Sequence, residues 1–465
     1  MSLVKKLIQK AEKEPGLHYR NPSVPYVCSI PGGLSVGSKI FIQGMVPSKN
    51  PDRFAINLLR GNDPEYSDIY LHFNPRFQEP FIVVRNARAG EWGKEETFGD
   101  SPFRPATPFL VVISAQSDGY EIEVDGSKFI DFNHRDGLPL TNVTHLSFTG
   151  DVIIHNIQIP VETLPKHLRC SIPGKTKIGD IFFIRGKIPS NGEGFAVNIQ
   201  CGSGKADDII FHLNPRFTEG LIVCNTLCDD TWADEQREAK MPFTAEKAFE
   251  LFICVGKDGF HTWVNGKHLS KFDHRLEMKK ACTLYIEGDV NVKDVWINSA
   301  PIHLPPDFGD DTPRDLQTSP FQRFVLPTGP VASRIPYGLV PGSVVVVSGF
   351  CDKDPSRFYI NLQCDNSDEA DIMLHYNPRW DDPEGEVVVQ NSRDEGSWGE
   401  EVRTIEKFPF FRNSHFDIQI FCQDDKYRIA VNGVSQVDFP HRLGLSRVDH
   451  ILVNGDVFIH RILVL

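Results

Sequence analysis

Several features that define other classes of protein are missing from this chain of 465 residues. No apolar run approaches the roughly 18 residues that a membrane-spanning helix needs, so we expect no membrane insertion. Lys and Arg number 49 against 62 Asp and Glu, which gives a formal net charge of -13, and no basic block suggests a phosphate-binding surface. This balance argues against a nucleic-acid partner.

The cysteines lack the arrangement of a disulfide framework or a metal site. There are 10 of them, and they do not recur at matching positions along the chain. Cys224 and Cys228 have no partner Cys or His at a metal-ligand spacing. The basic, amphipathic residues 1–10 lack the apolar core and cleavage site of a secretory signal. We therefore expect free thiols in a cytoplasmic protein, with no metal and no cofactor.

What the sequence does contain is one pattern in three copies. A strand-like stretch reads His-x-Asn-Pro-Arg at residues 72–76, 212–216 and 375–379. Other markers recur around it in a constant order, which indicates tandem domains rather than short solenoid repeats. They are Phe-x-x-Asn (54–57, 195–198, 358–361), Val-Asp/Asn-Gly (124–126, 264–266, 431–433), an aromatic before His-Arg (132–135, 272–275, 439–442) and Gly-Asp-Val (150–152, 288–290, 455–457).

The spacing of the copies predicts the domain limits. Gly44, Gly186 and Gly349 are equivalent, so the second interval exceeds the first by 163 − 142 = 21 residues. The surplus lies before the third copy, where residues 301–313 are acidic and rich in Pro, as in a linker. We predict an N-terminal extension at 1–20, domains at 21–163 and 164–303, a linker at 304–320 and a third domain at 321–465. Within the extension, the helical pattern of residues 3–12 fits either a short docking helix or a frayed tail. The first two domains should associate closely.

Each copy is predicted to be all-β. Residues 416–420 alternate strictly between apolar and polar side chains, which is typical of a half-buried strand. Asp125-Gly126 and its two counterparts are hairpin turns that need positive φ. No long helical stripe occurs inside a copy. Three tandem jelly-roll β-sandwiches, each of two antiparallel sheets, fit this pattern.

The repeated strand predicts a row of polar side chains on one surface. Side chains alternate faces along a β-strand, so the His, Asn and Arg of the pattern point the same way. Downstream in each copy come a strand ending in Asn, then a Trp, and a Glu three positions after that Trp. Two positions further on, the second and third copies have Arg, whereas the first has Thr97.

These are the candidate binding residues. In the first copy they are His72, Asn74, Arg76, Asn86, Trp92 and Glu95. In the second they are His212, Asn214, Arg216, Asn225, Trp232, Glu235 and Arg237. In the third they are His375, Asn377, Arg379, Asn391, Trp398, Glu401 and Arg403.

This set resembles the galectins, the β-galactoside-binding lectins, in three copies that span the chain past residue 20. The resemblance implies a jelly-roll sandwich that binds sugar across one sheet without calcium, and export without a signal peptide. It implies β-galactoside partners such as lactose and N-acetyllactosamine on glycoproteins or glycolipids. It also assigns galactose O4 to the His, Asn and first Arg, O6 to the second Asn and Glu, and O3 of the neighbouring sugar to the Glu and second Arg.

The residue types suit this ligand on chemical grounds as well. Galactose exposes an apolar C–H face, on which a flat Trp can stack. His, Asn and Arg can hold the axial C4 hydroxyl, and an epimer with an equatorial hydroxyl would leave them unpaired. Three such sites would make the chain a multivalent lectin that crosslinks glycans. The histidines of the His-Arg marker, each beside an aromatic residue, are expected to be structural, and Pro75 and its counterparts should end or bulge their strands.

Two alternatives remain open from the residues. A glycoside hydrolase needs two carboxylates about 5–10 Å apart, but each copy supplies a single recurrent Glu, so we expect no enzyme. The first domain, with Thr97, could be a degenerate lectin domain with weak or altered sugar binding that serves protein–protein or inter-domain contact. Arg85 and Arg88 are candidates to supply the charge that Thr97 lacks.

Overall fold

The computed structural model describes residues 15–298, 321–324 and 331–464, with short gaps at 21, 48, 106, 178–179, 205–206, 257–258, 266, 336–337, 405–407, 413 and 433. Within these residues the regular structure is β-strand, apart from the single 3-10 turns η1 (Leu140–Asn142), η2 (Met278–Lys280) and η3 (Leu445–Arg447). The all-β prediction is confirmed. No helix in the described part of the chain has the length and apolarity to cross a membrane. The helical pattern of residues 3–12 and the linker at 304–320 lie outside the described residues.

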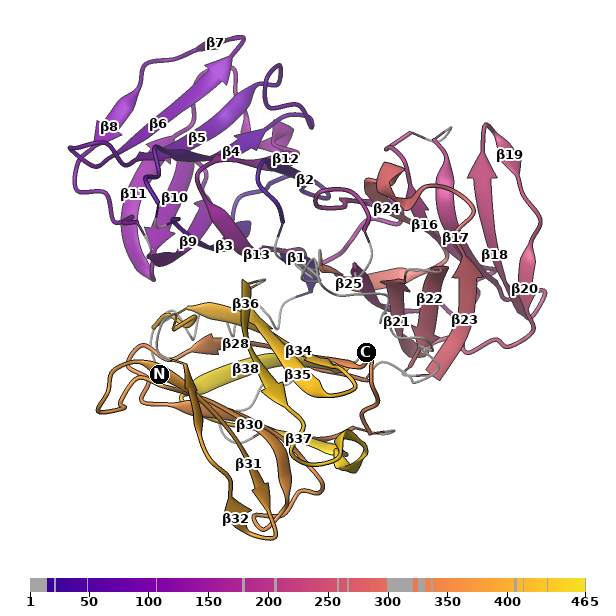
Figure 1. The fold of residues 1–465 in the computed structure, drawn as a ribbon. Coiled ribbons are helices and arrows are strands. Elements are labelled where there is room, and N and C mark those ends of the chain that lie inside the picture. The colour runs from indigo at the N-terminus through magenta and orange to yellow at the C-terminus, as the bar shows by residue number, and fades with distance from the viewer. Residues whose placement is uncertain are drawn as a thin grey trace. The chain divides into compact units, whose positions relative to one another are not determined.

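Domain 1 consists of two antiparallel sheets (Figure 1). Its site sheet, so named because it carries the His-x-Asn-Pro-Arg strand, has the order β2 (Tyr26–Ser29), β12 (His145–Gly150), β4 (Phe54–Leu59), β5 (Ile69–Arg76), β6 (Ile82–Ala89) and β7 (Glu91–Trp92), and β8 (Glu96–Phe98) also pairs with β6. Its back sheet has the order β11 (Ser127–Asn133), β10 (Gly119–Val124), β9 (Pro108–Ala115), β3 (Lys39–Met45), β13 (Ile153–Pro160) and β1 (Gly16–Arg20).

Domain 2 repeats this arrangement. Its site sheet has the order β14 (Leu168–Ser171), β24 (Thr283–Gly288), β16 (Phe195–Gln200), β17 (Ile209–Arg216), β18 (Leu221–Cys228) and β19 (Thr231–Trp232), with β20 (Gln236–Glu238) on β18. Its back sheet has the order β25 (Asn291–Asn298), β15 (Ile181–Lys187), β21 (Ala248–Val255), β22 (Gly259–Val264) and β23 (Lys267–Asp273).

Domain 3 has both sheets as well. The site sheet has the order β27 (Val331–Arg334), β37 (His450–Gly455), β29 (Phe358–Gln363), β30 (Ile372–Arg379), β31 (Val387–Asp394) and β32 (Ser397–Trp398), with β33 (Val402–Thr404) on β31. The back sheet has the order β26 (Phe321–Phe324), β38 (Val457–Val464), β28 (Val344–Cys351), β34 (His415–Cys422), β35 (Lys426–Val431) and β36 (Val434–Pro440).

The repeated sequence markers have clear structural roles. Asp125 and Gly126 adopt φ values of 52° and 81° in the turn between β10 and β11, as predicted for this hairpin. Phe54, which opens the Phe-x-x-Asn marker, is fully buried and packs on Phe103 and Phe109, with ring centroids 5.4 and 5.5 Å away. Equivalent aromatic trios, centred on Phe195 and Phe358, occupy the other two cores. This packing holds the two sheets together beneath the predicted site.

The proline of the repeated strand lies where that strand ends. β5 continues one residue past Pro75 and stops at Arg76, and β17 and β30 stop at the equivalent arginines. The pairing of β5 with β4 ends at Phe73, so Pro75 lies outside that ladder, although it is paired with Val83 of β6. The predicted end of the strand at this motif is confirmed.

The most unexpected feature of the fold is a strand shared by two domains. β1 pairs antiparallel with β13 of domain 1 and parallel with β25 of domain 2. The two back sheets thereby merge into one sheet of 11 strands (Figure 1). Residues 16–20, which the sequence placed in an N-terminal extension, are therefore part of the sandwich. In domain 3, β26 has the place on β38 that β1 has on β13, but it pairs with no second domain within the described residues.

Side chains fuse the two domains on both sides of this shared strand. Leu17 and Tyr19 are buried in a single hydrophobic core that continues through both domains, whereas domain 3 has a core of its own. On the opposite side of β1, His18 stacks on Trp296 with ring centroids 3.7 Å apart. The adjoining site sheets are also linked, because the Tyr26 hydroxyl of β2 donates to the Ser171 carbonyl at 3.0 Å. The expected close association of the first two domains is confirmed, and domain 3 belongs to a separate compact unit.

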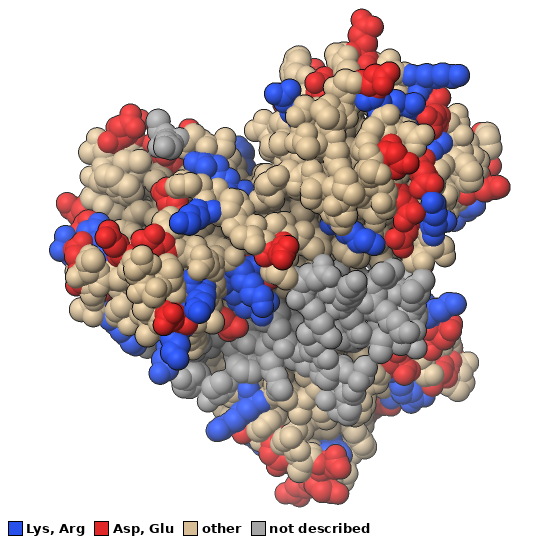
Figure 2. Space-filling model, turned by 180° about the vertical axis from the view of Figure 1, so that it is seen from behind, with Lys and Arg blue, Asp and Glu red and all other residues tan. Residues whose placement is uncertain are grey.

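Charged side chains of both signs lie on the face that Figure 2 shows. On this face, Lys and Arg alternate with Asp and Glu and form no continuous basic patch on the described residues.

We predict that replacing Tyr19 by Ala will destabilise domains 1 and 2 together. Tyr19 is fully buried, and truncating a buried aromatic residue costs about 3–5 kcal/mol. Scanning calorimetry of the full chain should show one shifted transition for the two fused domains and an unchanged transition for domain 3. Tyr66→Ala is the matched control, because Tyr66 is 81% exposed. Separate melting of domains 1 and 2, with only domain 1 shifted, would show that β1 does not fuse them.

Candidate functional site

The register of three neighbouring strands gathers the predicted residues of each domain on one surface. In domain 1, His72 of β5 lies opposite Asn57 of β4 and Asn86 of β6. The same register recurs in domains 2 and 3. The side chain between His and Asn of the repeated strand is fully buried in each domain, as Phe73, Leu213 and Tyr376. The alternation predicted from the sequence is confirmed.

A hydrogen bond to a neighbouring Asn fixes each of the binding-strand histidines. His72 Nδ1 lies 2.6 Å from Asn57 Oδ1, and Asn57 Nδ2 donates to Ser147 Oγ at 3.0 Å. The equivalent pairs are His212 with Asn198 at 2.6 Å and His375 with Asn361 at 2.7 Å. An amide oxygen can only accept, so His Nδ1 is the donor, and Nε2 is left as an acceptor for a ligand.

The histidines are held in their neutral form. Burial, with help from the nearby Arg76, lowers the pKa of His72 to about 4. Burial and the equivalent arginines lower the pKa of His212 and of His375 to about 4 as well. Each imidazole is therefore uncharged at neutral pH and presents a free acceptor.

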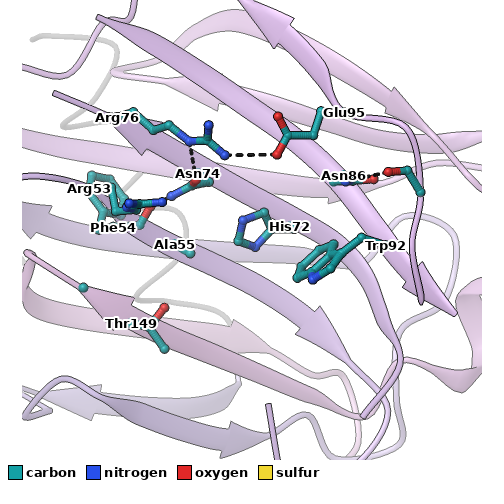
Figure 3. Close-up of a pocket in the computed structure, with 12 residues that line it drawn as sticks. Arg53, Phe54, Ala55, His72, Asn74, Arg76, Asn86, Trp92, Glu95 and Thr149 are labelled. Carbon is teal, nitrogen blue, oxygen red and sulfur yellow. Dashed lines mark hydrogen bonds and ion pairs between the residues drawn. The ribbon is translucent and has the colours of Figure 1, made fainter. Parts of the chain in front are cut away.

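The Asn, Arg and Glu side chains form a linked chain beside each histidine. Asn74 Nδ2 donates to the Phe54 carbonyl at 2.6 Å, and Arg76 Nε donates to Asn74 Oδ1 at 2.9 Å. Arg76 Nη2 then donates to Glu95 Oε1 at 3.1 Å (Figure 3). Domains 2 and 3 repeat this chain through Asn214, Arg216 and Glu235 and through Asn377, Arg379 and Glu401. The donors and acceptors are thus oriented before any ligand arrives.

The second Asn ties the following loop to the site sheet. Asn86 Nδ2 donates to the Gly93 carbonyl at 3.0 Å, directly after Trp92. Asn225 and Asn391 donate in the same way to the Ala233 and Gly399 carbonyls, both at 2.8 Å. Since this amide nitrogen has two hydrogens, one remains for a ligand.

The three tryptophans are surface residues, as the sequence predicted. Trp92, Trp232 and Trp398 are 48%, 47% and 49% exposed. Each ring lies beside the binding-strand histidine, with centroids 4.9, 4.7 and 4.9 Å apart. In Figure 3 the indole of Trp92 and the imidazole of His72 border the same open space. Each domain therefore offers one flat apolar surface next to a line of polar groups.

The domains differ in the last predicted residue. Arg237 Nε donates to Glu235 Oε2 at 2.7 Å, and Arg403 Nη1 donates to Glu401 Oε2 at 2.7 Å. Arg403 also bonds Asp382 at 2.6 Å, an acidic partner that the sequence pattern did not reveal. In domain 1 the same position on the strand holds Thr97.

Neither candidate replacement for that missing arginine reaches Glu95. Arg85 is buried, donates to the Asp131 carbonyl at 2.6 Å and pairs with Glu96 at 3.3 Å, so it points toward the back sheet. Arg88 donates to two loop carbonyls, and its guanidinium lies 5.3 Å from the Trp92 ring centroid. The expectation that one of them compensates for Thr97 is not met.

The site of domain 1 is an open cavity of about 520 Å³. Besides predicted residues it includes Arg53, Ala55 and Thr149, which extend it over β4 and β12 (Figure 3). The positions of Ala55 and Thr149 hold Ala196 and Glu287 in domain 2, and Tyr359 and Asn454 in domain 3. The sequence interpretation missed this region because these residues vary between the copies.

All 20 predicted residues thus fall on three equivalent surfaces, and a further recurrent residue was missed. That residue is the Asn of the Phe-x-x-Asn marker, which is Asn57, Asn198 or Asn361. Its strict recurrence was the available signal. One possible cluster of metal ligands, Asp208, Cys228 and Asp229, is found among the described residues. None of these three residues is among the repeated binding residues, so the cluster is not a component of the shared site.

The arrangement is suited to binding hydroxyl groups and not to general acid catalysis. Arg216 and Arg237 donate to Glu235 and lower the pKa of its carboxyl group. An ionised carboxylate can accept hydrogen bonds from hydroxyl groups, but it has no proton to give to a leaving group.

Comparison with known proteins agrees with this geometry. The family described as "Galactoside-binding lectin" matches residues 25–159, 167–297 and 330–464. Galectin-4 of Sus scrofa is 35% identical over 316 residues, covering 60% of this chain and 96% of that protein. Galectin-8 of Rattus norvegicus is 34% identical over 322 residues, covering 66% and 95%.

A nematode relative and a solved structure are also similar. The 32 kDa beta-galactoside-binding lectin of Caenorhabditis elegans is 31% identical over 275 residues, covering 59% of this chain and 96% of that protein. The crystal structure of Caenorhabditis elegans galectin LEC-6 is 30% identical, with a TM-score of 0.27, and covers 30% of this chain and 94% of that one. Since the family matches three segments that together exceed half of the sequence, the chain belongs to the galactoside-binding lectins, the galectins, and carries three of their domains.

Proposed function

We propose that this protein is a multivalent lectin that binds β-galactosides without calcium and crosslinks the glycans that carry them. The observation that supports this most strongly is the threefold recurrence of an exposed Trp beside a preset His, Asn, Arg and Glu network. Lactose and N-acetyllactosamine on glycoproteins or glycolipids are the proposed ligands.

The geometry favours galactose over its C4 epimer. Stacking of the apolar sugar face on Trp leaves the axial C4 hydroxyl directed at the His, Asn and Arg of the repeated strand. The neutral His accepts a hydrogen bond there, while Arg donates one. An equatorial hydroxyl would leave these groups without a partner, which is the efficient way to reject the epimer.

The proposed calcium independence is supported by how the polar groups are held. Each hydroxyl-binding side chain is oriented by another side chain or by a backbone carbonyl of the same domain. No ion is needed to bring them together.

The proposed crosslinking is supported by the number of sites on one chain. Shallow sugar sites bind weakly, but linking sites on one chain raises avidity by roughly 10²- to 10⁴-fold where the geometry allows simultaneous binding. The shared strand β1 makes the first two sites part of one body, which removes the orientational freedom that a flexible linker would leave between them.

A second function for domain 1 is favoured by the same strand. Domain 1 contributes β1 to the sheet of domain 2, so it has an inter-domain role besides its site. A domain with this role could retain its fold even if its sugar binding were weakened by Thr97.

We also propose, on the basis of 10 free cysteines, a cytoplasmic protein that is secreted without a signal peptide.

We predict that the full chain will bind about three lactose molecules in the presence of EDTA. Trp398→Ala should lower the stoichiometry from three to two, because it removes the stacking surface of one site. The melting temperature should stay unchanged, because the ring is half-exposed. Calorimetric titration and a thermal melt on the same samples test this. Loss of binding in EDTA would contradict calcium independence, and a lower melting temperature with three sites retained would show that the ring is structural.

Domain 1 is predicted to bind lactose more weakly than the other two domains. Thr97 cannot supply the planar charged donor that Arg237 and Arg403 provide. Losing one charge-assisted hydrogen bond costs on the order of 1.5–3 kcal/mol, and less where the site is open to water. Lactose titrations of full-length chains that retain only one of Trp92, Trp232 and Trp398 should rank the affinities of the three sites. Thr97→Arg should strengthen lactose binding by domain 1. No gain from that substitution would show that the position does not matter.

The pH dependence of binding should reveal the neutral histidine. Binding needs unprotonated Nε2, so affinity falls as the pH drops through the pKa, which is about 4 for each of the three histidines. Lactose affinity should therefore stay nearly constant from pH 7.5 to 5.5 and be about halved near pH 4. Titrations at graded pH, each with a melt to verify folding, provide the measurement. A midpoint near 6.5 would mean that the histidine is not held neutral in this way.

A further inference from the structure

One repeated marker has no role in the sites described so far. The aromatic residue followed by His-Arg occurs where β11, β23 and β36 of the back sheet end. Its histidines are structural, as expected. The Nε2 atoms of His134, His274 and His441 lie 3.3, 2.9 and 2.9 Å from backbone carbonyl oxygens, and each ring meets an aromatic ring edge-on. The arginines remain unexplained.

In domains 2 and 3 these arginines cross from the back sheet to the binding site. Arg275 Nη1 donates to Asn225 Oδ1 at 3.2 Å and to the Asp234 carbonyl at 2.7 Å. Arg442 Nη1 donates to Asn391 Oδ1 at 3.1 Å and to the Glu400 carbonyl at 2.7 Å. Each guanidinium also lies over the aromatic ring of its own marker, 4.5 and 4.8 Å from the centroid. The stacking fixes the arginine, and the arginine contacts the site.

The two acceptors of each arginine are parts of the sugar-binding apparatus. Asn391 Oδ1 also accepts from the Ser392 amide at 2.8 Å, so two donors fix the orientation of this side-chain amide. Its Nδ2 is thereby directed to the Gly399 carbonyl and to the open site. Glu400 lies between Trp398 and Glu401, so the second bond holds the segment that joins the stacking ring to the carboxylate.

Domain 1 has the same arginine but a different set of contacts. Arg135 lies over Phe132, 4.8 Å from its centroid, and forms an ion pair with Glu96. Glu96 in turn pairs with Arg85 at 3.3 Å. Within domain 1, where all of these positions are described, Arg135 makes neither a bond to Asn86 nor one to the carbonyl of Lys94.

The difference traces to two residues. Arg85 stands where the other domains have Cys224 and Gln390, as the pairing with Phe73, Leu213 and Tyr376 shows. Glu96 stands where they have Gln236 and Val402. Acidic Glu96 and basic Arg85, which domains 2 and 3 lack, thus divert Arg135 from the binding site.

We propose that Arg275 and Arg442 are positioning residues that preset the second Asn and the Trp-to-Glu segment for sugar binding, and that domain 1 has lost this control through Arg85 and Glu96. The inference rests on the proposed function, because it concerns how those sites bind galactose. Domain 1 provides the internal control, since its Arg135 also stacks on the aromatic ring of its marker but pairs with Glu96 instead of contacting the site.

The test uses full-length chains in which one site is intact. In the parent variant Trp92→Ala/Trp232→Ala, lactose binding measures the affinity of domain 3 alone. Adding Arg442→Met should weaken lactose binding about tenfold, the effect of a hydrogen-bond loss near 1.4 kcal/mol. In the parent Trp232→Ala/Trp398→Ala, the matched change Arg135→Met should leave binding within twofold. Methionine keeps an apolar side chain over the phenylalanine in both cases.

A second ligand separates positioning from a general loss of structure. The resemblance to galectins assigns galactose O6 to the second Asn, so a 6-deoxygalactoside cannot use the residue that Arg442 orients. Arg442→Met should therefore weaken binding of lactose that is deoxygenated at galactose C6 much less than that of lactose, because the two ligands differ only in this hydroxyl. A general disturbance of the site would weaken both ligands equally and would overturn the inference.

The outcomes also distinguish this inference from the proposed function. If the parent with domain 3 intact fails to bind lactose, the function proposed for that domain is wrong. If the parent binds and Arg442→Met binds equally well, the positioning role is wrong while the function stands. If Arg135→Met weakens domain 1 as much as Arg442→Met weakens domain 3, the contrast between the domains is overturned. Thermal melts of all variants identify any that fail to fold.

Discussion

The hydrogen bond between the binding-strand histidine and an asparagine of the adjacent strand is the constraint on which each site depends. At 2.6–2.7 Å in all three domains, it sets the tautomer of the imidazole and leaves Nε2 as an acceptor. Burial keeps that ring neutral. The bond exists only because the register of the central strands puts the two side chains opposite each other. Backbone pairing thus determines the hydrogen-bonding character of the surface that meets the ligand.

The shared strand gives the chain an uneven architecture. Domains 1 and 2 have one back sheet and one core, whereas domain 3 has its own. In a lectin with three sites, this makes two of them one structural unit. The domains also differ where their sites meet the surrounding sheet, since Thr149, Glu287 and Asn454 occupy equivalent positions.

Much of this could be predicted from the sequence, for a physical reason. Period-two alternation fixes which side chains share a face, so the row of His, Asn and Arg was predictable in each copy. The exposed tryptophans were predictable from their loop-like context. The shared strand was not, because β1 and β25 are far apart in sequence and nothing local reveals which strand edges meet. The role of Asn57 and its counterparts needed the strand register, and the diversion of Arg135 needed the side-chain geometry of Arg85 and Glu96.

We propose that the preset His, Asn and Arg row recognises the axial C4 hydroxyl of galactose beside a stacking Trp. Lactose and cellobiose differ in the configuration of that one carbon, so their comparison isolates it. Calorimetric titration of the full chain with both disaccharides, in EDTA, is the most direct measurement. We expect clear binding of lactose and at least tenfold weaker binding of cellobiose, since an equatorial hydroxyl leaves those groups unpaired. Equal binding of the two sugars would contradict the proposal.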